Sequence, residues 1–538
     1  WHHNTQLGGF MTTVVIGSGI NGMVAAAELA RAGIDTVLVE RADRIGGFVA
    51  AEAERTLPGF LHDTYSSWHP LFVSSAAFGE LGDELAARGL SYSNSDDAVT
   101  ASTADVQGER RTTIAYRDPQ RTAEGFGLAS DRDAYLGMLD QFGPRAPFIF
   151  GALGAELGSN RVAGKLGWKA FRALKADGLE SLVRDSLTSA RSYLRRNFTG
   201  WEVDALWTPW GLHSGLGPDH ATGGMMIPVF AAAMHQFGLP IVTGGAAEFL
   251  TAFERLLRDS GVEIRTGEEA EEIIVSGGKV TGVRTSSGTI AADTVLASVS
   301  PGALYGSLLR SSREVASQRT SAESYRPGRA AMQLHFALDR PVQWEDPALG
   351  SVPLIHLSDG SGSTGIACAQ AEAGLLPSSP TVVVGQQSML DPSRAPEGKA
   401  TLWLQLQEVP FAPIGDAAER IDTSGGWENV DLRKHYVDRV IDRLETFAPG
   451  TRESILATDV IAPTDLLAAN PNAIAGDPYA GSAELDQNLR WRPMPGAAGH
   501  RTPVAGVWHI GAATHPGPGL GAGSGHLVAQ RIITGKTR

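Results

Sequence analysis

Short apolar runs alternate with an alanine-rich segment near the start of the chain. Residues 12–16 and 36–40 carry the compact β-branched pattern of buried strands, and residues 23–32 between them have a helical composition that ends at Gly33. A strand, a glycine turn, a helix and a second strand within about thirty residues form a βαβ unit. Because the strands of such a unit are parallel, the pattern predicts an α/β fold with a Rossmann-type parallel sheet.

Strand-like runs return from residue 241 onward, around a further helix at residues 246–259. The predicted strands are 241–243, 263–266, 273–275, 280–285, 294–297 and 507–511. The last strand leads through a glycine-rich turn into a final helix from Gly525 onward. A mixed region before it contains an apolar run at 381–384 and a helix at 432–447.

This order of elements predicts two interleaved domains. We expect residues 11–62, 239–305 and 488–538 to form the parallel-sheet domain, which is discontinuous in sequence. The remaining residues, 63–238 and 306–487, form an inserted mixed α+β domain for the substrate, and residues 63–238 in particular have a mainly helical pattern. Residues 1–10 are expected to be a cloning remnant, because a strand pattern follows Met11 directly.

Composition and charge narrow the class of protein. The chain has 538 residues, of which 42% are hydrophobic and 19% charged, so it can bury a large core. A net charge of −14 argues against nucleic acid as a partner. Cys368 is the only cysteine, which excludes disulfide reductase chemistry and fits a reducing, cytoplasmic location. No run approaches the roughly 18 apolar residues of a transmembrane helix.

The turn after the first strand carries a dinucleotide fingerprint. Gly17-Ser18-Gly19-Ile20-Asn21-Gly22 follows a strand and opens a helix, whose N-terminus favours phosphate. The first glycine permits the tight turn, the second permits close approach of a pyrophosphate, and the third permits close helix–strand packing. Glu40 ends the second strand, where its carboxylate can accept hydrogen bonds from ribose hydroxyls. An acid at that position disfavours NADP.

A second match to the same expression occurs at residues 360–365. No acidic residue follows the run at 381–384, so we expect this segment to be a flexible loop and not a nicotinamide site.

Further segments carry a family resemblance. Gly46-Gly47 follows Glu40 closely and resembles the extended fingerprint of flavoproteins in the phytoene desaturase and amine oxidase superfamily. The stretch 57–66 resembles the segment that leads toward the flavin in phytoene-desaturase-like enzymes, and residues 511–519 resemble the tail that closes over the flavin. Segments 470–472 and 476–477, together with Gln487, also resemble segments of that family. The chain is similar to phytoene-desaturase-like FAD oxidoreductases, near the branch named pyridine nucleotide-disulfide oxidoreductase domain-containing protein 2.

This resemblance implies FAD as the cofactor and a two-domain architecture. It places the backbone near Ala270 against the adenine. The implied cofactor-binding residues are Gly17, Gly19, Ile20, Asn21, Gly22, Glu40, Arg41, Gly46, Gly47, Ala270, Gly511, Ala512, Gly519 and Gly521.

Two histidines are the candidate catalytic residues. His515 lies inside the tail that the resemblance places over the flavin, where it either contacts flavin or substrate or bonds to the backbone as a structural residue. His69 follows the segment near the flavin and is the second candidate. Asp63 is expected to cap a loop. The spacing of the histidines indicates no metal site.

Two other clusters have a structural and a functional interpretation. Trp201, Trp207 and Trp210 suit either a pocket for a flat apolar molecule or, more commonly, core packing. Basic residues recur at helical spacing between Arg161 and Arg172, which suits peripheral contact with an anionic membrane surface. A solvated helix face is the simpler interpretation of the basic cluster.

The favoured function is an FAD-dependent dehydrogenase, desaturase or oxidase that removes a hydride from a C–H bond of a largely apolar, unsaturated or cyclic small molecule. Dioxygen or a quinone is the expected electron acceptor, because no second fingerprint supports a nicotinamide domain. The alternatives are a redox-neutral isomerase that uses reduced flavin, a flavin-binding protein without catalysis, and an amine oxidase. The substrate and the oligomeric state are not specified by the sequence.

Overall fold

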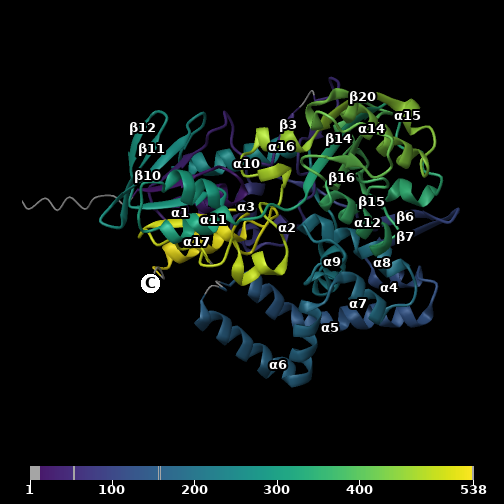
Figure 1. The fold of residues 1–538 in the computed structure, drawn as a ribbon, viewed down its shortest axis with the longest axis horizontal. Coiled ribbons are helices and arrows are strands. Elements are labelled where there is room, and N and C mark those ends of the chain that lie inside the picture. The colour runs from purple at the N-terminus through teal and green to yellow at the C-terminus, as the bar shows by residue number, and fades with distance from the viewer. Residues whose placement is uncertain (1–11, 53–54, 156, 158, 498, 536–538) are drawn as a thin grey trace, which may run out of the picture.

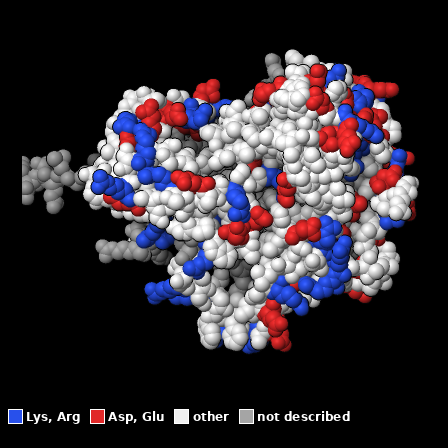
Figure 2. Space-filling model, viewed as in Figure 1, with Lys and Arg blue, Asp and Glu red and all other residues white. Residues whose placement is uncertain are grey.

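The computed structural model describes residues 12–52, 55–155, 157, 159–497 and 499–535. The expected cloning remnant, residues 1–10, lies outside them. Figure 1 shows two bodies built on separate sheets and a helical region below the second body. Acidic and basic side chains are mixed over the face seen in Figure 2. Among the described helices, none has the length and apolar character needed to cross a membrane.

A five-stranded parallel sheet organises the first body. Its order is β21-β13-β1-β2-β9, and every neighbouring pair is parallel. The strands are β1 (Thr13–Ile16), β2 (Thr36–Val39), β9 (Glu263–Arg265), β13 (Thr294–Ser298) and β21 (Val507–Ile510). Four lie within the predicted strand segments and β13 extends one residue beyond its segment, so the predicted Rossmann-type sheet is confirmed.

Alternation of side chains along these strands builds two apolar layers. Val15, Leu38 and Leu296 face the helices α1 (Ile20–Arg31), α10 (Ala246–Asp259) and α17 (Gly523–Ile533). The intervening residues face a three-stranded antiparallel sheet on the other side. That sheet consists of β10 (Ala270–Ser276), β11 (Lys279–Thr285) and β12 (Gly288–Ala291).

A seven-stranded mixed sheet organises the second body, in the order β20-β14-β18-β17-β15-β6-β7. Its strands are β6 (Ala98–Val106), β7 (Glu109–Tyr116), β14 (Ala330–Leu338), β15 (Leu354–Leu357), β17 (Val382–Gly385), β18 (Ala400–Val409) and β20 (Ile455–Ile461). The hairpin of β6 and β7 falls in the stretch predicted to be mainly helical, so that prediction is wrong there. The hairpin pairs with β15, a long-range contact that local pattern does not reveal.

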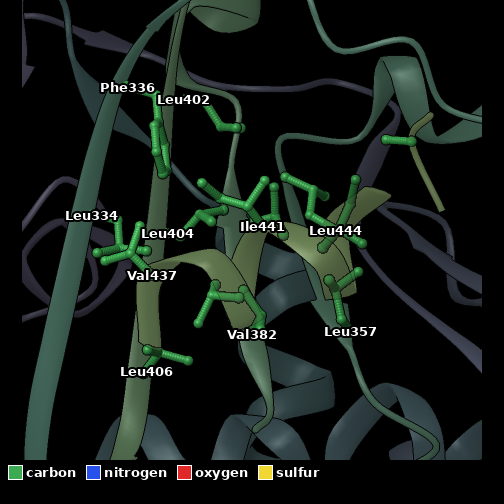
Figure 3. Close-up of a cluster of buried hydrophobic side chains, with 14 of the residues drawn as sticks. Leu334, Phe336, Leu357, Val382, Leu402, Leu404, Leu406, Val437, Ile441 and Leu444 are labelled. Carbon is green, nitrogen blue, oxygen red and sulfur yellow. The ribbon is translucent and has the colours of Figure 1, made fainter. Parts of the chain in front are cut away.

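One face of this sheet is apolar and is covered by α14 (Val430–Glu445). Figure 3 shows Leu402, Leu404 and Leu406 of β18 pointing toward Val437 and Ile441 of the helix. The helix lies at the predicted place. The buried apolar residues of α14 recur at helical spacing, and those of the strands occur at every second position. Each element therefore buries one apolar face.

A helical region covers part of the opposite face. It contains α5 (Ala129–Leu153), α6 (Asn160–Leu187), α7 (Ala190–Asn197), α8 (Glu202–Trp207) and α9 (Gly223–Phe237). Trp207 and Trp210 are buried in the core between these helices and the sheet, at 0% and 5% exposure. Packing therefore accounts for these two residues of the tryptophan cluster.

The second G-x-G-x-x-G segment is not the flexible loop that was expected. It opens α12 (Ser361–Glu372), directly after the turn at Gly360. The carboxylate of Asp204 accepts hydrogen bonds from the backbone N–H and the hydroxyl of Ser361, at 2.8 and 2.7 Å. The helix N-terminus is thus capped from a distant part of the chain by Asp204 and locally by Asp359, whose Oδ1 accepts the N–H of Ser363 at 2.7 Å. Asp204 occupies the place where a phosphate would bind.

Shorter elements connect these layers. They are β3 (Ala51–Glu52), β4 (His62–Asp63), α2 (Pro70–Val73), α3 (Ala76–Ala86), β5 (Tyr92–Ser93), α4 (Pro119–Glu124), β8 (Ile241–Val242), α11 (Ala316–Glu323), β16 (Leu375–Leu376), α13 (Gln387–Leu390), β19 (Gly415–Asp416), α15 (Thr451–Ser454) and α16 (Pro463–Ala469).

Candidate functional site

The glycine turn after β1 forms a cradle at the carboxyl edge of the parallel sheet. Gly17 has φ +90°, a conformation that L side chains rarely adopt. A Cβ on Gly22 would lie 1.9 Å from the carbonyl oxygen of Gly17, so α1 packs against β1 only because this residue is glycine. A Cβ on Gly19 would meet no described atom within 4 Å, so open space borders the turn where a pyrophosphate is expected. Ile20 and Asn21 begin α1, whose N-terminus points its N–H groups toward that space.

Glu40 holds this turn from the end of β2. Its Oε2 accepts hydrogen bonds from the N–H and the hydroxyl of Ser18, at 2.8 and 2.7 Å, and its Oε1 accepts one from the N–H of Ala42 at 2.9 Å. A carboxylate has about four acceptor positions, so one remains for a ribose hydroxyl. Sequence reasoning missed the role of Ser18.

The second glycine pair lies directly across from the first turn. Gly46 forms a parallel bridge with Gly19 and donates its N–H to the carbonyl oxygen of Ser18 at 3.1 Å. Gly47 is exposed, and a Cβ there would approach the Cα of Gly19 to 3.1 Å. The structure therefore brings the two glycine segments together, as two sides of one cradle. Arg41 lies beside them on the surface.

The segment implied to meet adenine lies beside Glu40. The N–H of Glu268 donates to the carbonyl oxygen of Glu40 at 3.0 Å, and that of Gly267 to Ala42 at 2.7 Å. Ala270 opens β10 two residues later. Ala270 therefore follows the segment that contacts Glu40, and its place against the adenine stays a prediction.

The C-terminal tail closes the same sheet edge. A Cβ on Gly511 would approach Ser298 Oγ to 3.0 Å, and one on Gly17 would approach the carbonyl oxygen of Ser298 to 2.9 Å. Both glycines therefore contact the end of β13. Asn472 also lies there, because its side chain accepts the N–H of Ser300 at 2.8 Å. The side-chain Oδ1 of Asn21 accepts a hydrogen bond from the N–H of Gly525 at 3.0 Å, and this bond joins α17 to α1.

Gly519 and Gly521 lie farther along the tail. A Cβ on Gly519 would meet the Leu71 side chain at 2.5 Å, and one on Gly521 would approach the carbonyl oxygen of Leu71 to 3.4 Å. Gly519 thus allows the tail to pack on α2, whereas a side chain at Gly521 would make only an ordinary contact there. Their assignment as flavin contacts stays a prediction.

The carbonyl of Ala512 is held by a fully buried arginine. Arg492 donates to Ala512 O at 2.8 Å and to the carbonyl oxygen of Tyr479 at 2.9 Å. Burial lowers the pKa of Arg492, with Tyr325 and Asp477 opposing that shift. Arg492 is a positioning residue that sequence reasoning missed.

His515 is buried, and its ring contacts the helical region. Its Nε2 donates to the carbonyl oxygen of Ala152 in α5 at 2.9 Å, and its own carbonyl oxygen accepts from His500 Nε2 at 2.8 Å. These bonds are those of a structural histidine, one of the two roles predicted for it. The catalytic role of His515 stays a prediction.

His69 lies in an aromatic core. Its ring is edge-on to Phe249 of α10, with centroids 5.0 Å apart, and its Nδ1 lies 3.1 Å from the hydroxyl of Tyr92. Burial lowers the pKa of His69 to about 4, Asp63 raises it and Arg394 lowers it further. These surroundings favour a packing role, and the catalytic role of His69 also stays a prediction.

Asp63 was expected to cap a loop, and it instead caps the first turn of the helix α10. Its Oδ1 accepts the N–H of Ala246 at 2.7 Å, and its Oδ2 pairs with Arg394 at 2.8 Å, both side chains being 1% exposed. Arg394 also donates to the carbonyl oxygen of Val242 at 2.7 Å. This buried pair joins the first body to the second.

The second face of the seven-stranded sheet carries polar and aromatic groups that sequence reasoning missed. On β14 and β18 the residues alternating with the apolar ones are Gln333, His335, Trp403, Gln405 and Gln407. Gln333 donates to the carbonyl oxygen of Tyr65 at 3.1 Å, in the segment expected to lead toward the flavin. This contact sets the polar face opposite that segment. The alternation of Leu402, Leu404 and Leu406 with these residues was the signal available in the sequence.

Comparisons with known proteins agree with this geometry. A family model for flavin containing amine oxidoreductases matches residues 20–533. The pyridine nucleotide-disulfide oxidoreductase domain-containing protein 2 of Rattus norvegicus is 26% identical over 570 residues, covering 97% of this chain and 93% of its own length. The neurosporene-forming phytoene desaturase of Rhodobacter capsulatus is 26% identical over 547 residues, covering 98% and 95%. An oxidoreductase structure from Methanosarcina mazei superimposes with a TM-score of 0.63 at 16% identity, covering 97% of this chain and 100% of its own.

Proposed function

Because the chain belongs to the family of flavin-containing amine oxidoreductases, we propose that it dehydrogenates a largely apolar, unsaturated or cyclic small molecule, with FAD as its cofactor. Dehydrogenation removes a hydride from one carbon and a proton from its neighbour, and leaves a double bond. When bound, FAD supplies the two-electron acceptor for the hydride.

FAD fits the cradle at the edge of the parallel sheet. The open space beside Gly19, the exposed Gly47 and the N-terminus of α1 suit a pyrophosphate, and the remaining acceptor position of Glu40 suits a ribose hydroxyl. Gly511 and Ala512 would border the flavin end. The protein's contribution is to fix these backbone groups, through Ser18 and Arg492, before the cofactor binds.

The observation that carries the substrate class is the polar face of β14 and β18. Gln333, Gln405, Gln407 and Trp403 are neutral at every physiological pH. Burial lowers the pKa of His335 well below its ordinary value, so this ring is also neutral. The carboxylates beside this face are each paired with an arginine: Asp459, opposite His335 on β20, with Arg55, and Asp63 with Arg394. A wall of amides and rings whose neighbouring carboxylates are already paired suits an uncharged molecule better than a protonated amine. The similarity to a phytoene desaturase supports the same class.

An oxidant other than a nicotinamide is the proposed partner of this reaction. Asp204 occupies the N-terminus of α12, in the second glycine-rich segment. Dioxygen or a quinone is therefore the proposed acceptor.

Extraction of the purified protein, followed by mass spectrometry of the released small molecules, tests this proposal. We expect FAD together with an uncharged, unsaturated or cyclic compound. A co-purified amine would overturn the substrate class. Turnover of the identified compound without consumption of an acceptor would instead establish a redox-neutral isomerase, and failure of any compound to react would favour a flavin protein without catalysis.

A further inference from the structure

The first half of α6 is strongly cationic. Between residues 160 and 176 it carries no acidic residue, in a chain whose net charge is −14. Its basic residues are Arg161, Lys165, Lys169, Arg172 and Lys175. The local charge therefore opposes that of the whole protein, which marks this segment as a candidate surface for an anionic partner.

Two large aromatic side chains are exposed on the same segment. Trp168 is 61% and Phe171 43% exposed, and their rings stack with centroids 5.8 Å apart and planes at 25°. Exposed apolar residues are normally scattered singly, whereas a tryptophan and a phenylalanine in contact leave a continuous apolar patch in water.

Helical spacing puts the aromatic pair beside the basic residues. Trp168 is three residues after Lys165 and four before Arg172, so all three project from one side of the helix. Ala170, on the opposite side, is 4% exposed, and the Leu166 side chain lies against Gly151 of α5. The buried side thus fixes the helix to α5 and leaves the aromatic and basic side free. We call that side the docking face: Arg161, Lys165, Trp168, Lys169, Phe171 and Arg172.

The placement of the docking face suits a flat partner. Figure 1 shows α6 at the lower edge of the molecule, away from both large sheets. The helix breaks at Lys175, where φ is 61° and ψ −174°, so the docking half has its own direction. The adjoining α5 touches the tail at the cofactor site, because its Ala152 carbonyl accepts the hydrogen bond of His515.

We propose that the docking face binds the surface of an anionic lipid bilayer. Tryptophan and phenylalanine enter the interface between headgroups and acyl chains, and lysine and arginine are attracted to anionic headgroups. A second copy of the chain is a poorer partner, since it would bring one cationic face against another. Lipid binding of this face does not depend on the proposed reaction, so the two proposals can fail separately. Together they would place the site next to the phase in which an apolar substrate dissolves.

Flotation of the full chain with lipid vesicles tests the proposal. We expect binding to vesicles of phosphatidylcholine with phosphatidylglycerol and far weaker binding to phosphatidylcholine alone. Lys165→Ala with Lys169→Ala should weaken binding by about tenfold or more. Trp168→Ala with Phe171→Ala should weaken it by about tenfold, with unchanged flavin content and far-UV circular dichroism.

Matched control variants distinguish binding by the docking face from nonspecific attraction between the protein and the vesicles. Lys399→Ala with Lys434→Ala removes the same charge from exposed positions elsewhere, and Ile414→Ala removes an apolar side chain that is 77% exposed. Both controls should bind vesicles as the unaltered chain does. Absence of vesicle binding, or equal losses in the docking-face and control variants, would overturn the proposal and leave an acidic protein as the partner to test.

Discussion

The Nε2 atom of His515 donates a hydrogen bond to the carbonyl oxygen of Ala152, 2.9 Å away and 363 residues earlier in the chain. This bond ties the tail at the cofactor site to the end of α5. A histidine held in this way orients the tail, and its engaged Nε2–H is not available for transfer without breaking the bond.

The first prediction follows from that bond. His515→Ala should leave most FAD bound and slow substrate-driven flavin reduction by less than about tenfold, short of the 10²–10⁴ typical of general acid–base catalysis. His515→Gln, which can still donate to Ala152, should restore most of the rate. Anaerobic stopped-flow absorbance measures both variants. A loss of a hundredfold or more in both, with an altered pH profile, would assign proton transfer to His515.

Glu40 should determine FAD affinity. Glu40→Ala removes the acceptor of both Ser18 donors and of the ribose, and hydrogen bonds to a charged group contribute about 1.5–3 kcal/mol each. We expect the Kd for FAD to rise by at least about tenfold. Glu263→Ala, an exposed acid on β9, is the control. Equal FAD affinity in the two variants would contradict the proposed cradle.

Nicotinamide cofactors should not reduce the flavin. The carboxylate of Asp204 sits where the second glycine-rich segment would bind a phosphate, and like charges repel. Anaerobic mixing of the holoenzyme with NADH or NADPH should leave the flavin absorbance unchanged on the timescale of turnover. Rapid bleaching by either compound would show that a nicotinamide site exists.

Buried histidines should make the fold sensitive to acid. Burial lowers the pKa of His509 to about 4, with its hydrogen bond to Val299 raising it and His500 lowering it. Between that value and the ordinary value of about 6.5 the unfolded state binds more protons, so stability falls as the pH falls through this window. Within this window, each such histidine lowers the free energy of unfolding by up to about 1.4 kcal/mol for every unit by which the pH falls.

His509→Gln isolates one of these contributions, because glutamine can still donate to Val299. Denaturant titration measures the unfolding free energies of the variant and of the unaltered chain. We expect the difference between them to shrink by about 1 kcal/mol per pH unit as the pH falls from 6.5 to 4, because only the unaltered chain loses the contribution of His509. A constant difference across that window would mean that His509 is not buried neutral.

The parallel-sheet body could be predicted from the sequence because its signals are local. The helix at 246–259 and the strands around it follow from short periodic patterns and glycine turns. The glycine cradle was equally visible, since Gly17, Gly22 and Gly46 each have a steric reason to be glycine, and Gly19 borders the open space expected for a pyrophosphate.

The second body depended on contacts that are distant in sequence. Arg394 and Asp63 are 331 residues apart, and Asp204 caps α12 from 157 residues away. No local pattern encodes such partners. The polar face of β18 is different, because its alternation with Leu402, Leu404 and Leu406 is a local strand pattern that the sequence carries.

Anaerobic titration of the purified holoenzyme tests the central claim most directly. About one FAD per chain should be present, and its absorbance should bleach on addition of an uncharged, unsaturated or cyclic hydrocarbon, with a more unsaturated product formed in equal amount. Primary amines should leave it oxidised. Absence of FAD, or bleaching by amines and not by the hydrocarbons, would contradict the account.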